Sequence, residues 1–270
     1  MSNRDIKVMG IINVNDDSYF EQSRARQIDA FASRAERLIQ EGADVIDIGA
    51  CSTRPGAEMV DSECEWGRLN AVLELWNRKS FSSSVQLSID TFRSEIVSRA
   101  FDVAGHLTVN DISAGSEDDS MLKVVSSLHL PYIAMHRRGT CATMHEQYRY
   151  ENILSEVLDY FRKFEQKAAL VGLEDYIIDP GFGFSKSIEE NYVLLNNLSA
   201  LRQLHHPVLV GLSRKRMIYE TLGITPQDSL PATCAIHLHA LLAGADILRV
   251  HDVKEAVECV KLYHTIEQFR

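Results

Sequence analysis

The chain has 270 residues, and its 28 Lys and Arg against 38 Asp and Glu give a formal net charge of −10. A duplex phosphate backbone is bound through clustered basic residues, so this acidic balance predicts no nucleic-acid partner. With 45% hydrophobic and 24% charged residues, the composition is that of a globular protein. No apolar run reaches the ~18 residues that a membrane span requires, so no membrane partner is expected.

The cysteines and the start of the chain indicate a reducing compartment. The five cysteines are widely separated and never form a Cys-x-x-Cys pair, which predicts free thiols: Cys51, Cys64, Cys141, Cys234 and Cys259. Charged residues stand at the start, where a signal peptide has its apolar stretch. We therefore expect a cytoplasmic protein, with residues 1–270 forming one domain.

Short β-branched, apolar runs alternate along the chain with longer segments of helical period. The predicted strands are 6–12, 45–48, 86–89, 107–109, 132–135, 176–178, 208–210 and 247–250. The predicted helices between and after them are 28–41, 63–77, 94–103, 151–170, 187–202, 231–243 and 253–269. Eight strands with intervening helices in about 250 residues predict the α/β class and a single (β/α)8 TIM barrel. A doubly wound sheet is the alternative, although no Gly-x-Gly-x-x-Gly follows the first strand.

Four helical segments run into a glycine just before the next strand, at Gly42, Gly105, Gly172 and Gly244. A helix commonly ends on a residue of left-handed backbone conformation, which glycine adopts without steric cost. These glycines therefore predict where four helices end.

Each predicted strand leads into polar residues. The polar residues at or just after the ends of the eight strands are, in chain order, Asn13, Ser52, Asp90, Asn110, His136, Asp179, Ser213 and Arg249. One such residue is more often a turn former or a helix cap than a functional group. In a barrel, however, all the strands end at the same mouth, where the active site lies. Eight polar strand ends together predict a functional site there.

Two kinds of chemistry meet at this mouth. Asp90, Asn110, Asp179 and Lys215 offer carboxylate, amide and ammonium groups that can recognise a flat heterocycle with several donors and acceptors. Cations and an amide suited to phosphate oxygens come from Arg54, Arg249, His251 and Asn13. The residues thus predict an enzyme that joins or cleaves a compound carrying both a heterocycle and a phosphate.

The same residues resemble those of the dihydropteroate synthases, pterin-binding enzymes of folate synthesis that sulfonamides inhibit. The matching segments are spread over nearly the whole chain, at 9–14, 47–57, 88–91, 109–113, 135–140, 178–184, 210–215 and 247–252. The resemblance implies a Mg²⁺-dependent condensation of 6-hydroxymethyl-7,8-dihydropterin diphosphate with 4-aminobenzoate, which gives 7,8-dihydropteroate and diphosphate. It also implies a homodimer.

The resemblance assigns roles by position. The pterin would be held by Asp90, Asn110, Asp179 and Lys215 and would lie against Met135, Phe184 and Arg249. Arg249 and His251 would contact the diphosphate, and Asn13 would ligate Mg²⁺. Thr53, Arg54 and Pro55 of the second loop, and Tyr19 of the first, would contact diphosphate or aminobenzoate. The implied catalytic residues are Lys215, Arg249, His251 and Asp90.

The sequence departs from the family at several places. The first loop lacks the usual Thr-Pro and Gly-Gly pairs, and Tyr19 replaces a Phe. Cys51 stands at a usual Glu, and Arg216 at a usual Ser, where it would either pair with the aminobenzoate carboxylate or point to solvent. Two alternatives to the synthase are a non-catalytic pterin-binding paralogue, which the altered loop favours, and a corrinoid-linked pterin methyltransferase.

Overall fold

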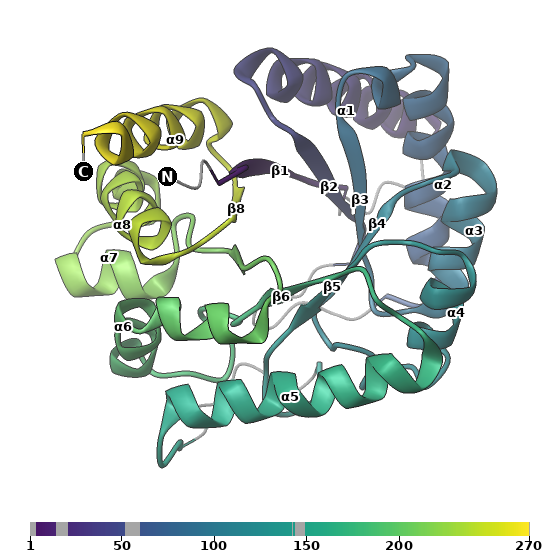
Figure 1. Ribbon diagram of the computed structural model, residues 1–270. Coiled ribbons are helices and arrows are strands. Elements are labelled where there is room, and N and C mark those ends of the chain that lie inside the picture. Colours follow the sequence, from purple (N-terminus) through teal and green to yellow (C-terminus); the bar gives the residue numbers. More distant parts are fainter. Residues whose placement is uncertain (1–3, 15–20, 52–59, 142, 144–148, 270) are drawn as a thin grey trace.

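Eight strands run parallel to one another, and helices cover the outside of the barrel that they form (Figure 1). This computed structural model describes residues 4–14, 21–51, 60–141, 143 and 149–269, with the backbone alone at residues 21–27. The predicted α/β barrel is confirmed.

The strands and helices alternate in chain order. The strands are β1 (Lys7–Asn13), β2 (Val45–Gly49), β3 (Gln86–Asp90), β4 (Thr108–Asp111), β5 (Tyr132–Met135), β6 (Tyr176–Asp179), β7 (Leu209–Val210) and β8 (Ile247–Val250). The α-helices are α1 (Glu21–Glu41), α2 (Ser62–Arg78), α3 (Ser94–Ala104), α4 (Met121–Ser127), α5 (Ile153–Val171), α6 (Ile188–Asn196), α7 (Arg216–Leu222), α8 (Leu230–Ala243) and α9 (Val253–Gln268).

The barrel closes unevenly. The strands are hydrogen-bonded in the order β6-β5-β4-β3-β2-β1-β8-β7. Between β6 and the short β7 there is only an isolated parallel bridge, Ile178 with Val208, supported by a 3.0 Å bond from the Ile178 N–H to the Pro207 carbonyl. We call this the β6–β7 seam. It lies beside two of the predicted site residues, Asp179 and Lys215.

Alternation along the strands explains why polar residues gather at one end of the barrel. Side chains two apart on a strand share a face. Ile177 and Ile247 form part of a small apolar cluster inside the barrel near the start of the strands. Asp179 and Arg249 follow two residues later and point to the same face. The predicted site is thus formed by the inward-facing strand residues that lie next to the small apolar cluster, on the side of the strand ends.

The element boundaries differ from the sequence predictions in a few places. The helix predicted at 187–202 ends at Asn196, and a 3-10 helix, Leu198–Leu204, follows. The Asn197 side chain donates to the Val193 carbonyl at 2.8 Å at this break, and such local side-chain bonds compete with helix continuation. Helices α4 and α7 were not predicted, since seven residues give too little periodic signal.

The four glycine helix ends are confirmed. Gly42, Gly105, Gly172 and Gly244 have φ angles of 96°, 73°, 72° and 116°. All four values lie in the region that favours glycine. Each glycine stands between a helix and the strand that begins a few residues later.

The first described residue ties the start of the chain to its last two helices. The Arg4 guanidinium donates to the Tyr263 hydroxyl and to the carbonyl oxygens of Leu241 and Ala245. It also lies 4.9 Å from the centroid of the Tyr263 ring. Among the described helices, none combines the length and the apolar character needed to cross a bilayer.

Candidate active site

Arg249 is the centre of an ion-pair network inside the barrel mouth. Its Nε donates to Asp47 of β2 at 2.7 Å, and its Nη2 donates to Asp90 of β3 at 2.7 Å. The two carboxylates therefore hold the guanidinium from two strands, in charge-assisted bonds that are stronger than neutral ones. These hydrogen bonds fix the orientation of the Arg249 guanidinium.

Asp47 also reaches two further residues of the network. Its Oδ1 accepts from the Ser88 hydroxyl at 2.7 Å, and its Oδ2 accepts from the Asn110 amide nitrogen at 3.0 Å. Asp47 and Ser88 are fully buried, and Asn110 is nearly so. The Asp47 carboxylate thus connects Ser88 of β3, Asn110 of β4 and Arg249 of β8.

The other half of the site lies across the β6–β7 seam. The Asp179 Oδ1 accepts from the Gly181 N–H at 2.8 Å, which shapes the turn after β6. From the far side of the seam, the Lys215 ammonium lies 4.5 Å from the centroid of the Phe184 ring. The structure therefore brings Asp179, Phe184 and Lys215 together, as predicted.

The predicted pterin-binding residues leave a defined pattern of free polar atoms. Among the described residues, no partner is found for Asp90 Oδ1, Asn110 Oδ1 or Asp179 Oδ2, and no acceptor for Lys215 Nζ. The only fully buried, unpaired side-chain polar atoms in the described part lie elsewhere, on His136 and His237. The four free atoms therefore reach the open mouth, as three acceptors and one donor.

Burial changes the protonation of these groups. Desolvation, followed by the neighbouring carboxylates Asp47 and Glu65, raises the pKa of Asp90 to about 7 in spite of Arg249. Desolvation likewise raises the pKa of Asp179 and lowers that of Lys215 to about 8. The site thus holds ionisable groups that titrate near neutral pH, as functional sites often do.

A second lysine supports the turn that carries Asp179. The Lys186 ammonium is buried and donates to the carbonyl oxygens of Gly181, Phe184 and His136 at 2.9, 3.0 and 3.4 Å. Desolvation lowers its pKa to about 7. Lys186 therefore fixes the backbone on which Asp179 and Phe184 are presented.

Between about pH 7 and about pH 10.4, we expect the free energy of unfolding to rise with pH more steeply for the wild type than for Lys186→Met. The unfolded lysine keeps its proton to about pH 10.4, whereas the folded one loses it near 7, so raising the pH in this window favours folding by up to about 1.4 kcal/mol per pH unit. Denaturant titrations across the window measure both slopes. Lys123→Met, at an exposed position of α4, should keep the wild-type slope. Equal slopes for wild type and Lys186→Met would contradict the assignment.

An apolar wall lines the mouth beside these polar groups. Met135 and Phe184, both predicted to contact the ligand, belong to one cluster with Cys51, Phe92 and Ile112. Burial, followed by the charge of Glu65, raises the pKa of the Cys51 thiol. Cys51 is therefore a packing residue in its thiol form, which argues against a nucleophilic role.

The ends of the second loop are fastened although residues 52–59 lie outside the described part. The Arg68 guanidinium donates to the Ala50 carbonyl at 2.8 Å, before the loop. After it, Arg93 donates to the Val60 carbonyl at 2.6 Å and pairs with the buried Glu65. Both flanks are thus held at the barrel mouth.

The remaining predicted residues divide into three groups. Asn13 is exposed at the end of β1, and its Oδ1 lies 3.5 Å from where a Cβ on Gly49 would be, next to Asp90. His251 follows β8, with its backbone held by Ser213 and Arg34. The first- and second-loop residues Tyr19, Thr53, Arg54 and Pro55 lie outside the described residues.

Arg216 takes the second of the two orientations considered. Its side chain is 58% exposed and donates to Glu220 at 2.7 Å, one turn along α7. It is therefore a surface residue in this structure, whereas Lys215, one position earlier, faces Phe184.

Asp47 and Lys186 were missed as site residues by the sequence reasoning. Asp47 interrupts the apolar strand Val45–Gly49 at an inward position, and a charge in such a strand must find a partner inside the barrel. That was a usable signal. Lys186 had none, since it bonds only to backbone carbonyls in a loop.

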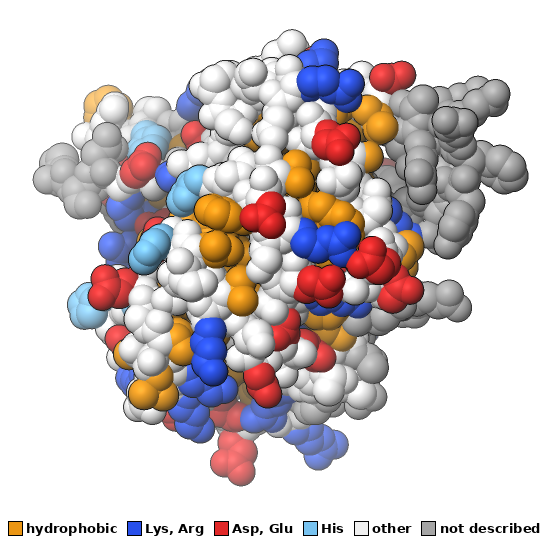
Figure 2. Space-filling view, turned by 90° about the vertical axis from the view of Figure 1, so that its right-hand side faces the viewer, with side chains coloured by type: hydrophobic (Ala, Val, Ile, Leu, Met, Phe, Trp, Pro, Cys, Tyr) orange, Lys and Arg blue, Asp and Glu red, His pale blue; other side chains and the backbone are white. Residues whose placement is uncertain are grey.

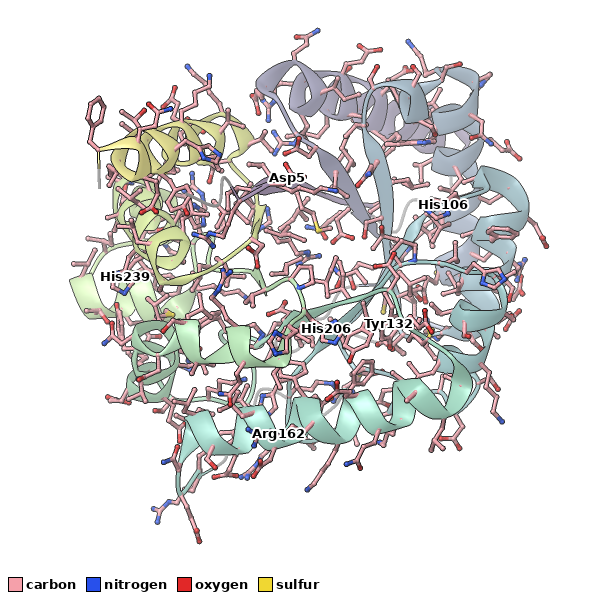
Figure 3. The ribbon with its side chains drawn as sticks, in the orientation of Figure 1. Asp5, His106, Tyr132, Arg162, His206 and His239 are labelled. Carbon is pink, nitrogen blue, oxygen red and sulfur yellow. The ribbon has the colours of Figure 1, made fainter. Side chains whose placement is uncertain are left out.

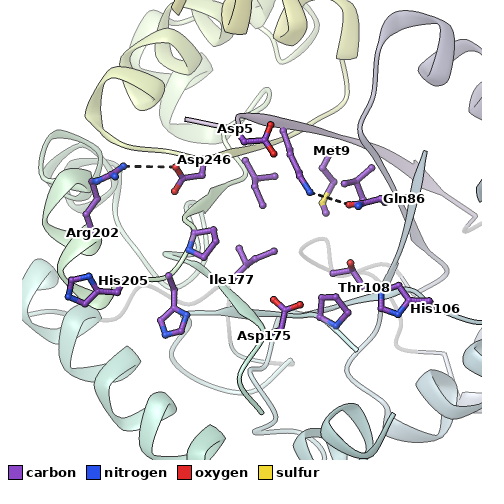
Figure 4. Close-up of a pocket in the computed structure, with 16 residues that line it drawn as sticks. Asp5, Met9, Gln86, His106, Thr108, Asp175, Ile177, Arg202, His205 and Asp246 are labelled. Atoms are coloured by element: carbon purple, nitrogen blue, oxygen red, sulfur yellow. Dashed lines mark hydrogen bonds and ion pairs between the residues drawn. The ribbon is translucent and has the colours of Figure 1, made fainter. Parts of the chain in front are cut away.

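A second hollow of about 760 Å³ lies at the opposite end of the barrel, where the strands begin. Asp5, His106 and His206 lie around this opening, whereas Arg162 and His239 lie on the outer helices (Figure 3). Figure 4 shows two interactions among the groups that line it, the 4.0 Å contact of Arg202 with Asp246 and the Lys7–Gln86 bond. Most of its charged groups are exposed, so we place the active site at the other mouth.

Comparisons with known proteins agree with this geometry. Residues 9–251 match the family model described as pterin binding enzyme. The chain is 36% identical to a dihydropteroate synthase of Escherichia coli, over 94% of this chain and 89% of that protein. It is 38% identical to a mitochondrial folate synthesis bifunctional protein of Pisum sativum, over 96% of this chain. The chain spans 53% of that plant protein's length.

A solved structure shows the same fold. A Xanthomonas albilineans dihydropteroate synthase with 4-aminobenzoic acid superposes with a TM-score of 0.87 at 36% identity, covering 98% of this chain and 94% of the other. The sequence and structural matches extend over the whole barrel, including every strand end that carries a site residue. The chain therefore belongs to the pterin-binding enzyme family, among the dihydropteroate synthases.

Proposed function

We propose that this protein is a dihydropteroate synthase, which joins 6-hydroxymethyl-7,8-dihydropterin diphosphate to 4-aminobenzoate. The observation that carries the proposal is the set of free atoms at the mouth, three acceptors on Asp90, Asn110 and Asp179 and one donor on Lys215. A dihydropterin presents the complement, with N–H groups along its edge and a carbonyl beside a ring nitrogen. Relatives with this name, and one with 4-aminobenzoic acid bound, support the choice of substrates.

Asp179 and Lys215 are proposed to bind opposite parts of the pterin ring. The Asp179 carboxylate can accept from the adjacent 2-amino and N3–H groups, as carboxylates do from a guanidinium. Lys215, held near Phe184, can donate to the carbonyl oxygen or to N5. The apolar surfaces of Met135 and Phe184 can then cover the flat ring.

Arg249 and His251 are proposed to face the diphosphate. Arg249 stays protonated, because the nearby Asp47 and Asp90 raise its pKa even though burial opposes this. Its positive charge is held in place before the substrate arrives, so it can stabilise the departing diphosphate without reorganisation.

We propose Mg²⁺ as the cofactor. The exposed Asn13 oxygen lies beside Asp90 and has no hydrogen-bond partner among the described residues, which suits an ion that keeps several waters and binds largely through substrate phosphates. Asn13 would hold the ion, which supplies positive charge to the diphosphate oxygens when bound.

The reaction exchanges one bond for another. The C–O bond to diphosphate breaks first and the leaving group takes the electron pair, while the electron-rich pterin delocalises the positive charge left on its methylene. The aminobenzoate nitrogen then forms a C–N bond to that methylene. The nitrogen then loses a proton to solvent. The second loop, fastened at Ala50 and Val60, would bring Thr53, Arg54 and Pro55 to the aminobenzoate and the diphosphate.

Diphosphate release by the purified protein tests this function. We expect release that requires 4-aminobenzoate, stops on chelation of Mg²⁺ and is lost in Lys215→Ala. Arg216→Ala removes the neighbouring, exposed cation and should retain activity. Tight binding of the dihydropterin without turnover would instead support the non-catalytic paralogue.

We also propose a homodimer formed through the later helices. Every exposed large hydrophobic side chain in the described part lies on α5 to α9 or just after it: Leu170, Val193, Leu222, Leu242, Leu262, Ile266 and Phe269. The face on the side of α2 to α4 instead shows charges of both signs among polar atoms, with only small apolar areas (Figure 2).

Light scattering coupled to gel filtration tests the dimer. We expect twice the chain mass of 30.5 kDa for the wild type and a shift towards monomer for Leu262→Asp/Ile266→Asp. Ser127→Asp, at an exposed position at the end of α4 and outside this set of helices, serves as the control for an added surface charge. A monomeric wild type would contradict the proposal.

We propose a reducing compartment such as the cytoplasm. All five cysteines are free in the structure, although Cys234 and Cys259 lie close together on α8 and α9. An oxidising compartment would favour pairing of such neighbours.

A further inference from the structure

One carboxylate inside the barrel contacts several site residues but has no exposed surface of its own. Asp47 is 0% exposed. Its two oxygens accept from Ser88, Asn110 and Arg249, on three other strands. Asp47 can therefore affect a ligand only through the residues to which it is hydrogen-bonded.

The contact with Asn110 determines which end of that amide faces the mouth. An ionised carboxylate paired with a guanidinium can only accept hydrogen bonds, so the Asn110 end turned towards Asp47 must be the NH₂ group. The amide oxygen is then directed away from Asp47, and it has no partner among the described residues. Asn110 therefore presents an acceptor to the ligand.

The contact with Arg249 restrains the second group. The Asp47 Oδ2 contacts both Nε and Nη2, at 2.7 and 2.5 Å, while Asp90 contacts Nη2 alone, so Asp47 holds the edge of the guanidinium at two points. Without Asp47, Asp90 would be the remaining carboxylate partner seen in the described part. A single contact leaves the plane of the guanidinium free to turn about it.

We propose that Asp47 is a positioning residue that fixes the donor–acceptor pattern of the pterin site by orienting Asn110 and Arg249. The inference rests on the proposed function for the identity of the ligand. Because Asp47 holds the Asn110 NH₂ group, the Asn110 oxygen faces the ligand and can accept hydrogen bonds from ring N–H groups. An unheld amide could rotate and present its NH₂ group, which would face the ligand's N–H groups and be repelled.

Asp47→Asn tests this role, with Ser88→Ala as the matched control. The asparagine keeps the shape but has no negative charge, so the position that accepts from both Arg249 and Asn110 holds at best a weaker, neutral acceptor. We expect affinity for 6-hydroxymethyl-7,8-dihydropterin, measured by calorimetry, to fall about 30- to 100-fold, as loss of charge-assisted bonds predicts. Ser88→Ala removes only the bond to the other Asp47 oxygen, so its affinity should stay within about threefold of the wild type.

A double-mutant cycle separates positioning from general damage. If Asp47 acts partly through Asn110, the effect of Asp47→Asn should shrink at least about threefold in an Asn110→Ala background. Full additivity, or an equal loss of affinity in Ser88→Ala, would overturn the proposal. So would wild-type affinity in folded Asp47→Asn. If the wild type itself does not bind the dihydropterin, the proposed function fails instead.

A measurement on the wild type keeps the inference testable without a ligand or a folded variant. The Asn110 side-chain NH₂ protons, assigned in NMR spectra by their absence in Asn110→Ala, should exchange slowly with water in the ligand-free protein, because they are bonded to a buried carboxylate. Exchange as fast as that of an exposed asparagine would overturn the assignment, whatever the ligand is.

Discussion

Asp179→Asn is expected to lower kcat/KM at least about 1,000-fold, which corresponds to about 4 kcal/mol of lost transition-state binding. The carboxylate is proposed to accept two N–H groups of the pterin, and each charge-assisted bond contributes about 1.5–3 kcal/mol. An asparagine can accept one of them and turns an NH₂ group towards the other. Steady-state diphosphate release measures the effect.

Misfolding should not account for this loss. Burial raises the pKa of Asp179, so the folded protein holds its negative charge at some cost, and the neutral asparagine retains the oxygen that accepts from Gly181. We therefore expect a thermal unfolding midpoint at or above that of the wild type. Asp175→Asn, at an exposed position just before the same strand, should change neither quantity. Activity of Asp179→Asn within tenfold of the wild type would refute the proposed contact.

Gly181→Ala is expected to destabilise the fold by about 3–5 kcal/mol, combining a left-handed backbone with overpacking. A Cβ at this position would lie 2.0 Å from the His136 carbonyl oxygen and 3.3 Å from Lys186 Nζ, with φ at +70°. Because the first of these atoms is backbone, the turn itself must move. Denaturant unfolding measures the loss, and displacement of Asp179 should reduce activity as well.

Gly223→Ala separates the two causes. Gly223 has a similar φ of +64° and a ψ of 34°, in the left-handed region, but no atom lies within 4 Å of its added Cβ. It should therefore show only the backbone cost of about 1–2 kcal/mol. Equal destabilisation of the two variants would mean that the contact with His136 is relieved at no cost.

The fold and half of the site could be predicted because they depend on local patterns. The strands show as β-branched runs, and the glycine helix ends follow from backbone sterics at single positions. Asp90, Asn110, Asp179 and Arg249 were found because a barrel places all its strand ends at one mouth, so their position along a strand was sufficient.

The rest depends on contacts between distant segments. Asp47 and Arg249 are 202 positions apart, and no local pattern indicates that one accepts from the other. The same holds for Lys186, whose partners are carbonyl oxygens that any residue could supply. The orientation of Arg216 was open for a related reason, since its Glu220 partner competes with a ligand carboxylate that the sequence cannot place.

The β6–β7 seam gives the ligand a mechanical role. Strands β6 and β7 are joined by a single bridge, so local opening of the barrel should cost the least free energy between these two strands. We therefore expect transient local unfolding to begin there. The proposed pterin contacts, Asp179 and Lys215, lie on opposite sides of the β6–β7 seam. A bound pterin that contacts both residues would therefore hold the two sides of the seam together. Part of its binding free energy would appear as slower hydrogen exchange at Ile178 and Val210, so that occupancy and closure of the barrel become one coupled equilibrium.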